Sequence, residues 1–428
     1  MTKVILGAAF FVVVVSAVSF AAEDLGVEAR IEKIEQENYR LRQMLSEQAD
    51  VISRLKARID KLENAASVPS GGQEDFGFVQ DDGFVAEEDV FSLGGGIAMP
   101  RFELRGFSDI EISSAVTPSE SNTTFSWGAL DLFLTSELTQ RLSFLAEMEF
   151  HPDKDTNSSS FHLERSNLKY SFSDLLNIKV GRMHTALGYW NQAYHHGTWL
   201  QTTISRPDIY EFEDDDGGFL PVHSVGLEFS GMRGFDGLDL EYNLALLNGR
   251  GRTVTEIQNG KDKNDSKAVN LLFSLSPHNL AGLKFGGGVY YDSIPADPGT
   301  AARAQRIVEL ITGGYISYVN DETEFLWEVF HIAHRDKTSG NDFGTLGFYL
   351  QGGYKIGKGL MPYYRFDFVD VGDGDPYFSP NDIDIRRHTL GLRWDVSSWN
   401  ALKFEYGFVD KKGKDDEHRL TLNSSFAF

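Results

Sequence analysis

The chain has 428 residues, a formal net charge of −23 and no cysteine, which excludes a disulfide scaffold and thiolate metal sites. The acidic balance argues against binding to nucleic acid and against docking on anionic lipid. A mean hydropathy of −0.28 excludes a bundle of apolar membrane helices.

Residues 1–21 have the pattern of a secretory signal peptide. Lys3 provides the positive start, the stretch Val4–Phe20 is apolar, and Ser19 and Ala21 are small residues suited to a cleavage site. The alternative is a single membrane-spanning helix, but no basic flank follows the apolar stretch. The pattern therefore predicts export from the cytoplasm.

Residues 22–66 are predicted to form a coiled-coil helix. Heptad positions a and d are mostly apolar, with polar residues only at Asn38 and Gln48. A thin amphipathic helix cannot bury this seam alone, so we expect a homotrimer through a periplasmic stalk. A dimer, which a buried Asn favours, and a single helix packed on the rest of the chain are the alternatives. Residues 67–99 form an acidic linker dotted with Gly and Phe, either a flexible spacer or a segment that docks at the mouth of the following domain or on a periplasmic partner.

Residues 100–428 alternate between apolar and polar side chains in one segment after another. In the last segment Leu420, Leu422 and Phe426 have one parity, and Thr421 and Asn423 have the other. Almost no helix lies between these segments to cover their apolar faces, so lipid is the expected cover. The pattern predicts an all-β transmembrane barrel of about 16 antiparallel strands. The expected spans are 101–113, 124–137, 141–151, 161–171, 176–186, 222–231, 237–247, 267–276, 281–292, 307–319, 323–334, 343–355, 360–369, 384–396, 401–410 and 417–428.

The predicted connections alternate between short turns and long loops. Short turns are expected at 139–140, 320–321, 357–359 and 397–400, and long loops at 114–123, 152–160, 187–221, 248–266, 293–306, 335–342, 370–383 and 411–416. Short turns belong on the periplasmic side and long loops outside. An even strand number then returns both ends of the barrel to the periplasm, where the stalk is expected.

This arrangement resembles the sixteen-stranded porins of the bacterial outer membrane. In those proteins the third extracellular loop folds into the lumen, a place that the longest loop, 187–221, matches here. The terminal Phe428 resembles the signal read by the barrel-assembly machinery, and Gly181-Arg182 resembles the phosphate-selective type. The basic ladder of that type is absent, because the lumen parity is mainly acidic. The resemblance implies a passive channel in the outer membrane for small hydrophilic solutes or ions.

Charged side chains identify the expected pore. The constriction is predicted to include basic and acidic residues of the long loop, and the lumen wall to include both signs. We expect the constriction at Arg182, His195, His196, Arg206, Glu211, Glu213, Asp214, Asp215 and Asp216, and lumen residues at Glu147, Glu149, Arg365, Asp367 and Arg393. Clustered carboxylates raise the local cation concentration, so a cation preference is expected.

No metal or cofactor is expected. The acidic run 211–216 could take Ca²⁺, and imidazoles at His184, His195 and His196 could take a transition metal. Without a metal, the acidic run would be a solvated loop tip, and the histidines with their aromatic neighbours would pack inside the barrel.

No catalytic motif stands out, so we expect a protein that is not an enzyme. Two other functions stay open: a barrel that sheathes a multihaem cytochrome in an electron conduit, and an envelope tether anchored by the barrel. The first requires a wide lumen with the long loop folded outward.

Overall fold

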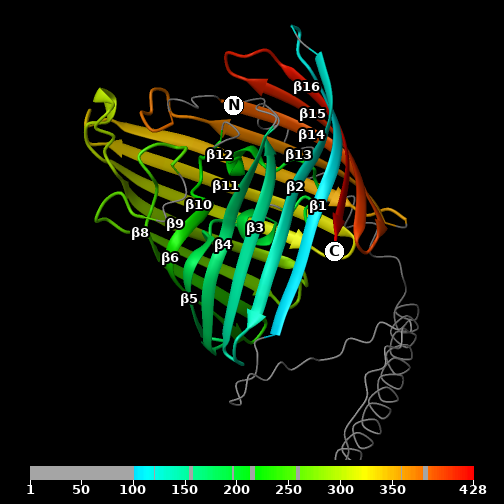
Figure 1. Ribbon diagram of the computed structural model, residues 1–428, viewed down its shortest axis with the longest axis horizontal. Helices are drawn as coiled ribbons and strands as arrows, with labels where there is room; N and C mark the ends of the chain where they lie inside the picture. The colour runs from blue at the N-terminus through cyan, green and yellow to red at the C-terminus, as the bar shows by residue number, and fades with distance from the viewer. Residues whose placement is uncertain are drawn as a thin grey trace, which may run out of the picture. The chain divides into compact units, whose positions relative to one another are not determined.

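The computed structural model describes residues 101–119, 121–153, 158–194, 197–212, 217–256, 261–357, 359–378 and 384–428. These residues form sixteen strands: β1 (Arg101–Val116), β2 (Ser121–Glu137), β3 (Leu142–Asp153), β4 (Ser158–Ser173), β5 (Leu176–His184), β6 (His223–Phe235), β7 (Leu238–Leu247), β8 (Ala268–Pro277), β9 (Leu283–Ile294), β10 (Ile307–Val319), β11 (Thr323–Asp336), β12 (Asp342–Tyr354), β13 (Leu360–Asp370), β14 (Ile385–Ser397), β15 (Asn400–Lys411) and β16 (Glu417–Ala427). Each strand pairs with its sequence neighbours, and β1 pairs with β16 (Figure 1), which closes the barrel. The predicted all-β barrel of sixteen strands is confirmed.

The segments predicted as signal peptide, coiled coil and linker, residues 1–21, 22–66 and 67–99, lie outside the described residues. Within the described ranges, no helix has the length and apolar character of a membrane span.

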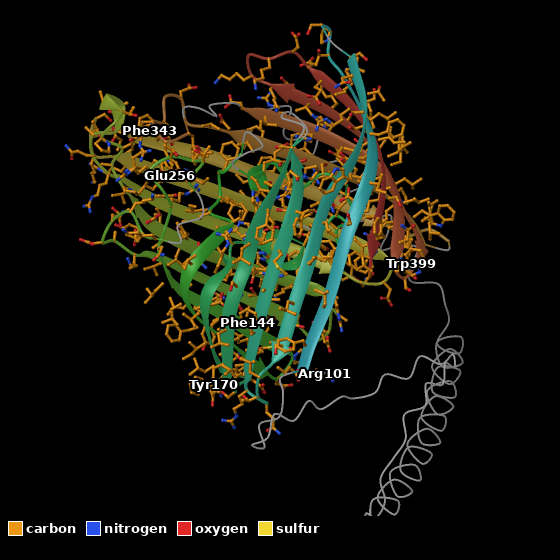
Figure 2. The ribbon with its side chains drawn as sticks, in the orientation of Figure 1. Arg101, Phe144, Tyr170, Glu256, Phe343 and Trp399 are labelled. Atoms are coloured by element: carbon orange, nitrogen blue, oxygen red, sulfur yellow. The ribbon has the colours of Figure 1, made fainter. Side chains whose placement is uncertain are left out.

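The two faces of the barrel have opposite polarity. On β15, Leu402 and Phe404 are 41% and 40% exposed on the outside, whereas Lys403 and Glu405 between them are buried inside. The same alternation holds on β13 and β16, as the sequence predicts, and Figure 2 shows side chains standing outward around the barrel. An apolar outer surface with buried charges inside is the reverse of a soluble protein and suits a hydrocarbon solvent.

Exposed aromatic side chains gather where strands enter or leave the short turns. They are Tyr170, Phe172, Phe235, Tyr354, Trp394, Trp399 and Phe428. Aromatic rings at such a level are typical of a membrane–water interface, where an apolar ring meets a polar medium.

The C-terminal residue helps to close the barrel. The backbone N–H of Gly106 donates to the carbonyl of Phe428 at 2.9 Å, and the N–H of Phe428 donates back to Gly106 at 2.9 Å. A Cβ at position 106 would lie 2.7 Å from the Phe428 ring, so only glycine allows the ring this close.

Two long loops expected from the sequence are much shorter. β1 continues to Val116 and β2 begins at Ser121, while β3 reaches Asp153 and β4 begins at Ser158. The prediction failed because Ser and Thr interrupt the apolar alternation without interrupting backbone pairing.

Apolar residues also fill part of the lumen. Inward-facing Ile294, Ile307, Ile311 and Ile332 pack with residues of the 185–222 connection in one buried cluster. The sequence analysis had placed charged side chains in a pore and had kept aromatic packing inside the barrel as an alternative. On the β9–β13 side the interior is instead a packed core, because the long connection covers the wall there.

Candidate functional site

The described residues of the connection between β5 and β6, 185–194, 197–212 and 217–222, lie inside the barrel. The connection contains a short helix, α3 (Trp190–Ala193), and one 3-10 turn, η1 (Asp208–Tyr210). At its neck the N–H of Thr185 donates to the carbonyl of Val222 at 2.9 Å. Beyond this neck, its described residues bond to inward-facing side chains of β11–β15 on the opposite wall. We call this segment the inner loop.

Glu328 of β11 holds the first half of the inner loop. Its carboxylate accepts the N–H groups of Tyr189 and Trp190 at 2.7 and 2.8 Å. The hydroxyls of Tyr210 and Tyr349 donate to the same carboxylate at 2.9 and 2.6 Å. Four donors thus converge on one buried carboxylate, which makes the contact strong and directional.

Two glycines let the loop come this close to the wall. Gly188 has φ +61°, and a Cβ there would collide with the Glu328 carboxylate and the Tyr210 hydroxyl. A Cβ on Gly347 of β12 would collide with the side chain of Ile209. Larger residues at either position would push the inner loop off the wall.

Arg365 of β13 holds the second half. Its guanidinium pairs with Asp367 at 2.8 Å and donates to the carbonyls of Ser205 and Arg206 at 2.7 and 2.8 Å. It also donates to the hydroxyls of Thr203 and Ser205 at 3.1 and 2.8 Å. The planar fork suits several acceptors at once, so a single side chain fixes this stretch of backbone.

Further contacts join the same stretch to β14 and β15. Lys403 donates to the carbonyls of Thr198, Gln201 and Thr203, and Arg393 donates to that of Gln201 at 2.7 Å. Arg387 pairs with Asp208 at 2.7 Å. The carboxylate of Glu405 accepts the N–H of Ile204 at 2.8 Å and the hydroxyl of Tyr363 at 2.9 Å.

The structure distributes the predicted site residues among distinct roles. The lumen residues Arg365, Asp367 and Arg393 bind the inner loop or one another, and Glu147 pairs with Arg165. Of the predicted constriction, Arg206 lies over the ring of Phe212 at 3.5 Å and Arg182 pairs with Glu164 at 3.5 Å. Glu211 follows η1 in the described part of the loop. His195, His196, Glu213, Asp214, Asp215 and Asp216 lie outside the described residues.

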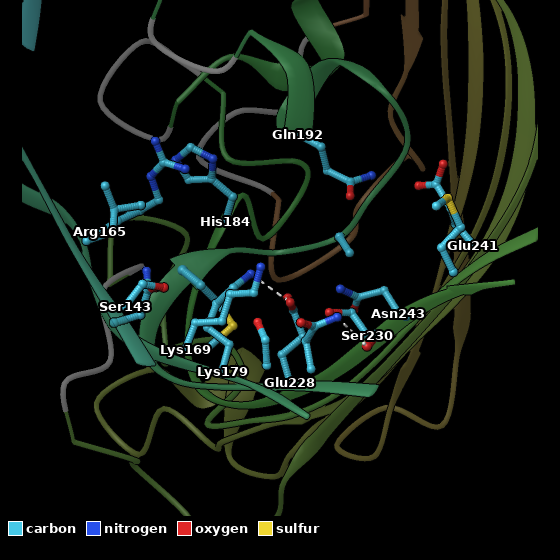
Figure 3. Close-up of a pocket in the computed structure, with 18 of the residues that line it drawn as sticks. Ser143, Arg165, Lys169, Lys179, His184, Gln192, Glu228, Ser230, Glu241 and Asn243 are labelled. Atoms are coloured by element: carbon cyan, nitrogen blue, oxygen red, sulfur yellow. Dashed lines mark hydrogen bonds and ion pairs between the residues drawn. The ribbon is translucent and has the colours of Figure 1, made fainter. Parts of the chain in front are cut away.

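A cavity of about 1160 Å³ lies on the other side of the lumen, against β1–β9. Its charged lining comprises the basic residues Arg101, Arg141, Arg165, Lys169, Lys179 and Lys284 and the acidic residues Glu103, Glu137, Asp174, Glu228 and Glu241. Lys179 pairs with Glu228 at 2.6 Å (Figure 3). Lys284 pairs with Glu241 at 2.7 Å. His184 and Gln192 line it from the inner-loop side. Of the bases, the sequence analysis had not singled out Arg165, Lys179 or Lys284, although inward parity on β5 and β9 marks the two lysines.

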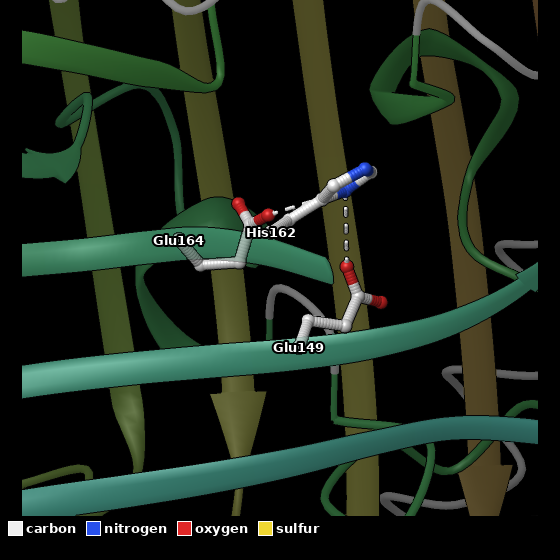
Figure 4. Close-up of side chains that lie close together, drawn as sticks. All are labelled: Glu149, His162 and Glu164. Atoms are coloured by element: carbon white, nitrogen blue, oxygen red, sulfur yellow. Dashed lines mark ion pairs between the residues drawn. The ribbon is translucent and has the colours of Figure 1, made fainter. Parts of the chain in front are cut away.

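A second polar cluster lies where β3 and β4 pair. The ligand atoms of Glu149, His162 and Glu164 lie within 4.8 Å of one another (Figure 4). Glu164 also contacts His223 at 2.7 Å. Sequence analysis had placed Glu149 in the lumen but had not singled out the other three residues.

The fold was compared with known proteins. No protein-family model matches the sequence, and no curated protein matches it. Solved structures do. The anion-selective porin from Comamonas acidovorans is 14% identical, with a TM-score of 0.55 over 77% of this chain and 100% of that one. The barrel has the porin fold. The outer-membrane channel DcaP of Acinetobacter baumannii is 13% identical, with a TM-score of 0.53 over 77% and 97% of the two chains.

Salmonella typhi OmpF, in complex with daunomycin, has the same fold. It is 12% identical, with a TM-score of 0.50 over 77% of this chain and 98% of its own. At such identities the likeness concerns the fold alone.

Inner-loop tyrosines should resist ionisation. Burial and the Glu328 carboxylate raise the pKa of Tyr210 well above its ordinary value of 10.0. Above about pH 10, Tyr210 in the docked loop therefore keeps a proton that the same tyrosine loses in the unfolded chain. The contribution of Tyr210 to docking stability is thus fully present below about pH 10 and decreases as the pH rises further.

An absorbance titration of tyrosine ionisation checks this. Tyr210→Phe should leave the amplitude near pH ~10–11 unchanged in the folded protein, yet lower it by one tyrosine in the denatured chain. An equal loss in both states would show that Tyr210 titrates normally.

Proposed function

We propose that this protein is a porin that lets small hydrophilic solutes or ions diffuse passively across the bacterial outer membrane. The observation that carries the proposal is the combination of an apolar barrel exterior with a polar cavity of about 1160 Å³ inside. Only a solvent of hydrocarbon suits the exterior, and only water suits the charged cavity. The short turns would face the periplasm, together with the trimeric stalk proposed at 22–66, and Phe428 would recruit the barrel-assembly machinery.

The permeation path proposed here runs between the inner loop and the wall formed by β3–β9. The contacts of Glu328 and Arg365 hold the loop against the opposite wall, which leaves this side for water and solutes. His184 and Gln192 face the path from the loop side, and Lys169 faces it from β4. The inner loop would thus set the narrowest section of the pore.

A cation preference remains our proposal, supported by lumen carboxylates whose hydrogen bonds come from neutral donors. Among the described residues, the hydrogen bonds of Glu324, Glu328 and Glu405 come from neutral donors. The acidic run 211–216 adds further negative charge to the inner loop. Carboxylates in a narrow, low-dielectric passage raise the local cation concentration. The lysines of β4 and β5 oppose this effect from the facing wall.

Reversal potentials in a planar bilayer with a KCl gradient test this balance. Neutralising Asp214, Asp215 and Asp216 together to Asn should lower the K⁺/Cl⁻ permeability ratio. Lys169→Gln should raise it, because it removes a cation that lines the cavity. Asp321→Asn, on the short β10–β11 turn, is the control and should change little. A ratio that the loop variant leaves unchanged would refute the cation preference while leaving the channel itself established.

The position of the inner loop bears on the sheath alternative. A cytochrome inside the barrel would have to displace a segment that is bonded to β11, β13, β14 and β15. The purified chain should therefore conduct alone. The sheath would be favoured if the purified chain gave no conductance across a bilayer and if a haem protein copurified with it.

A further inference from the structure

The strand β4 changes its phase in the middle. Glu147 of β3 pairs with Arg165, but the next residue, Met148, pairs with Leu163. Glu164 is therefore an extra residue in the ladder, a β-bulge. Leu163 and Leu168 both face outward although they differ in parity, which the bulge explains. A bulge of this kind re-aims a side chain, and bulges are enriched beside functional sites.

The bulge brings three ligand-type side chains together inside the barrel. His162 and Glu149 are direct cross-strand partners, and Glu164 joins them from the bulge. His162 Nδ1 lies 3.8 Å from Glu149 Oε2 and 3.6 Å from Glu164 Oε1 (Figure 4). Both distances are too long for good hydrogen bonds. They are close to the roughly 3.4 Å that separates two ligands of a tetrahedral ion bound at about 2.1 Å.

Burial gives the cluster an inside and an open side. The side chains of Glu149 and Glu164 are only 5% and 1% exposed, whereas that of His162 is 36% exposed. His151 Nδ1 lies 3.4 Å from the other oxygen of Glu149, on a side chain that is 38% exposed. An ion arriving from the lumen would meet the imidazoles first and then the two carboxylates behind them.

Neighbouring charged side chains orient the Glu164 carboxylate. Glu164 Oε2 faces His223 at 2.7 Å and Arg182 at 3.5 Å, so Oε1 is the oxygen directed at His162. The neighbouring Arg165 pairs with Glu147. Partners behind a ligating carboxylate hold it in position, as in established metal sites.

We propose that Glu149, His162 and Glu164 form a binding site for a divalent transition-metal ion of the zinc type, with the fourth position open to a water molecule from the lumen. Imidazole nitrogen together with carboxylate oxygen suits zinc and its neighbours in the first transition row. Calcium and magnesium are a poorer match, because they prefer oxygen ligands throughout. The site lies on β3 and β4, away from the histidines of the inner loop that the sequence had suggested.

Isothermal titration with ZnCl₂ tests the proposal on the full chain, purified in detergent and stripped with a chelator. The wild type should bind one ion per chain. His162→Gln and Glu149→Gln should each weaken binding by more than the roughly 10–100-fold that loss of an outer partner causes. A comparison of the gel mobility of heated and unheated samples confirms that each variant is folded. The measurement does not depend on conduction, so it stands apart from the proposed channel function.

Matched variants make the result decisive. His278→Gln removes another exposed histidine, which pairs with Asp239 at 3.1 Å on a short turn, and should leave zinc binding unchanged. The double variant His195→Gln/His196→Gln should also leave it unchanged. Zinc binding that survives His162→Gln, or that disappears with the inner-loop pair, would overturn the proposal. Calcium that binds as tightly as zinc, with an affinity that His162→Gln leaves unchanged, would also overturn it, since carboxylates alone would then account for the site.

Discussion

Glu328→Ala is expected to release the first half of the inner loop and to lower the mean single-channel conductance. The carboxylate accepts four hydrogen bonds, two from backbone N–H groups of the loop and two from tyrosine hydroxyls. Removing it leaves these buried donors without their acceptor, at a cost of about 1–3 kcal/mol for each group left unsatisfied. Movement of the freed stretch away from β11 relieves that cost, and it brings the loop into the path beside β3–β9.

Bilayer recordings and limited proteolysis measure this effect. The variant should conduct less current on average, with larger open-state fluctuations, and should be cleaved within the inner loop faster than the wild type. Glu241→Gln is the matched control, because Glu241 lines the cavity and pairs with Lys284 without contacting the loop. Unchanged conductance and unchanged cleavage would mean that the remaining contacts suffice to hold the loop.

Arg365→Met is expected to destabilise the protein by about 3–5 kcal/mol, the cost of breaking a buried ion pair from one side. The guanidinium is wholly buried, pairs with Asp367, and donates to two carbonyls and two hydroxyls of the inner loop. Methionine has a similar volume, so the loss is electrostatic rather than steric. Asp367 would keep a charge that no longer has its partner.

Urea unfolding in detergent measures the free energy of unfolding for this variant. Lys284→Met is the control: it breaks a half-exposed pair with Glu241, which should matter by less than about 1 kcal/mol. Adding Asp367→Asn to Arg365→Met should recover part of the loss, because it removes the uncompensated charge. Equal effects of the two single variants would contradict the anchoring role of Arg365.

The strands could be predicted because their solvent is simple. Hydrocarbon on one side and a polar interior on the other require side-chain polarity to alternate with a period of two. The sequence shows this alternation clearly from Lys403 to Phe408 of β15. Where the period faded, as at Ser113 and Ser114, the prediction ended the strand too early. Backbone pairing continued there, since Ser114 is the ladder partner of Thr123 on β2 and of Leu420 on β16.

The roles of the lumen charges could not be predicted in the same way. Parity places Arg365 and Lys403 inside, but it does not say whether water or protein meets them. Their acceptors include the carbonyls of Thr203 and Ser205, which lie 200 and 160 residues away in the sequence. Contacts at such separations leave no local pattern. Glu164 is a further case: the change of phase between Leu163 and Leu168 was visible in the sequence, yet only the register shows it as a bulge.

By itself, therefore, the sequence determined the sixteen-stranded barrel, the polarity of its two faces and the alternation of short turns with longer connections. Those features follow from local periodicity, which each strand expresses independently. Only the tertiary structure decided that the inner loop lies against β11–β15, that the cavity opens beside β1–β9 and that His162 meets two carboxylates. These features depend on contacts between distant segments, whose energies exist only once the barrel has brought the segments together.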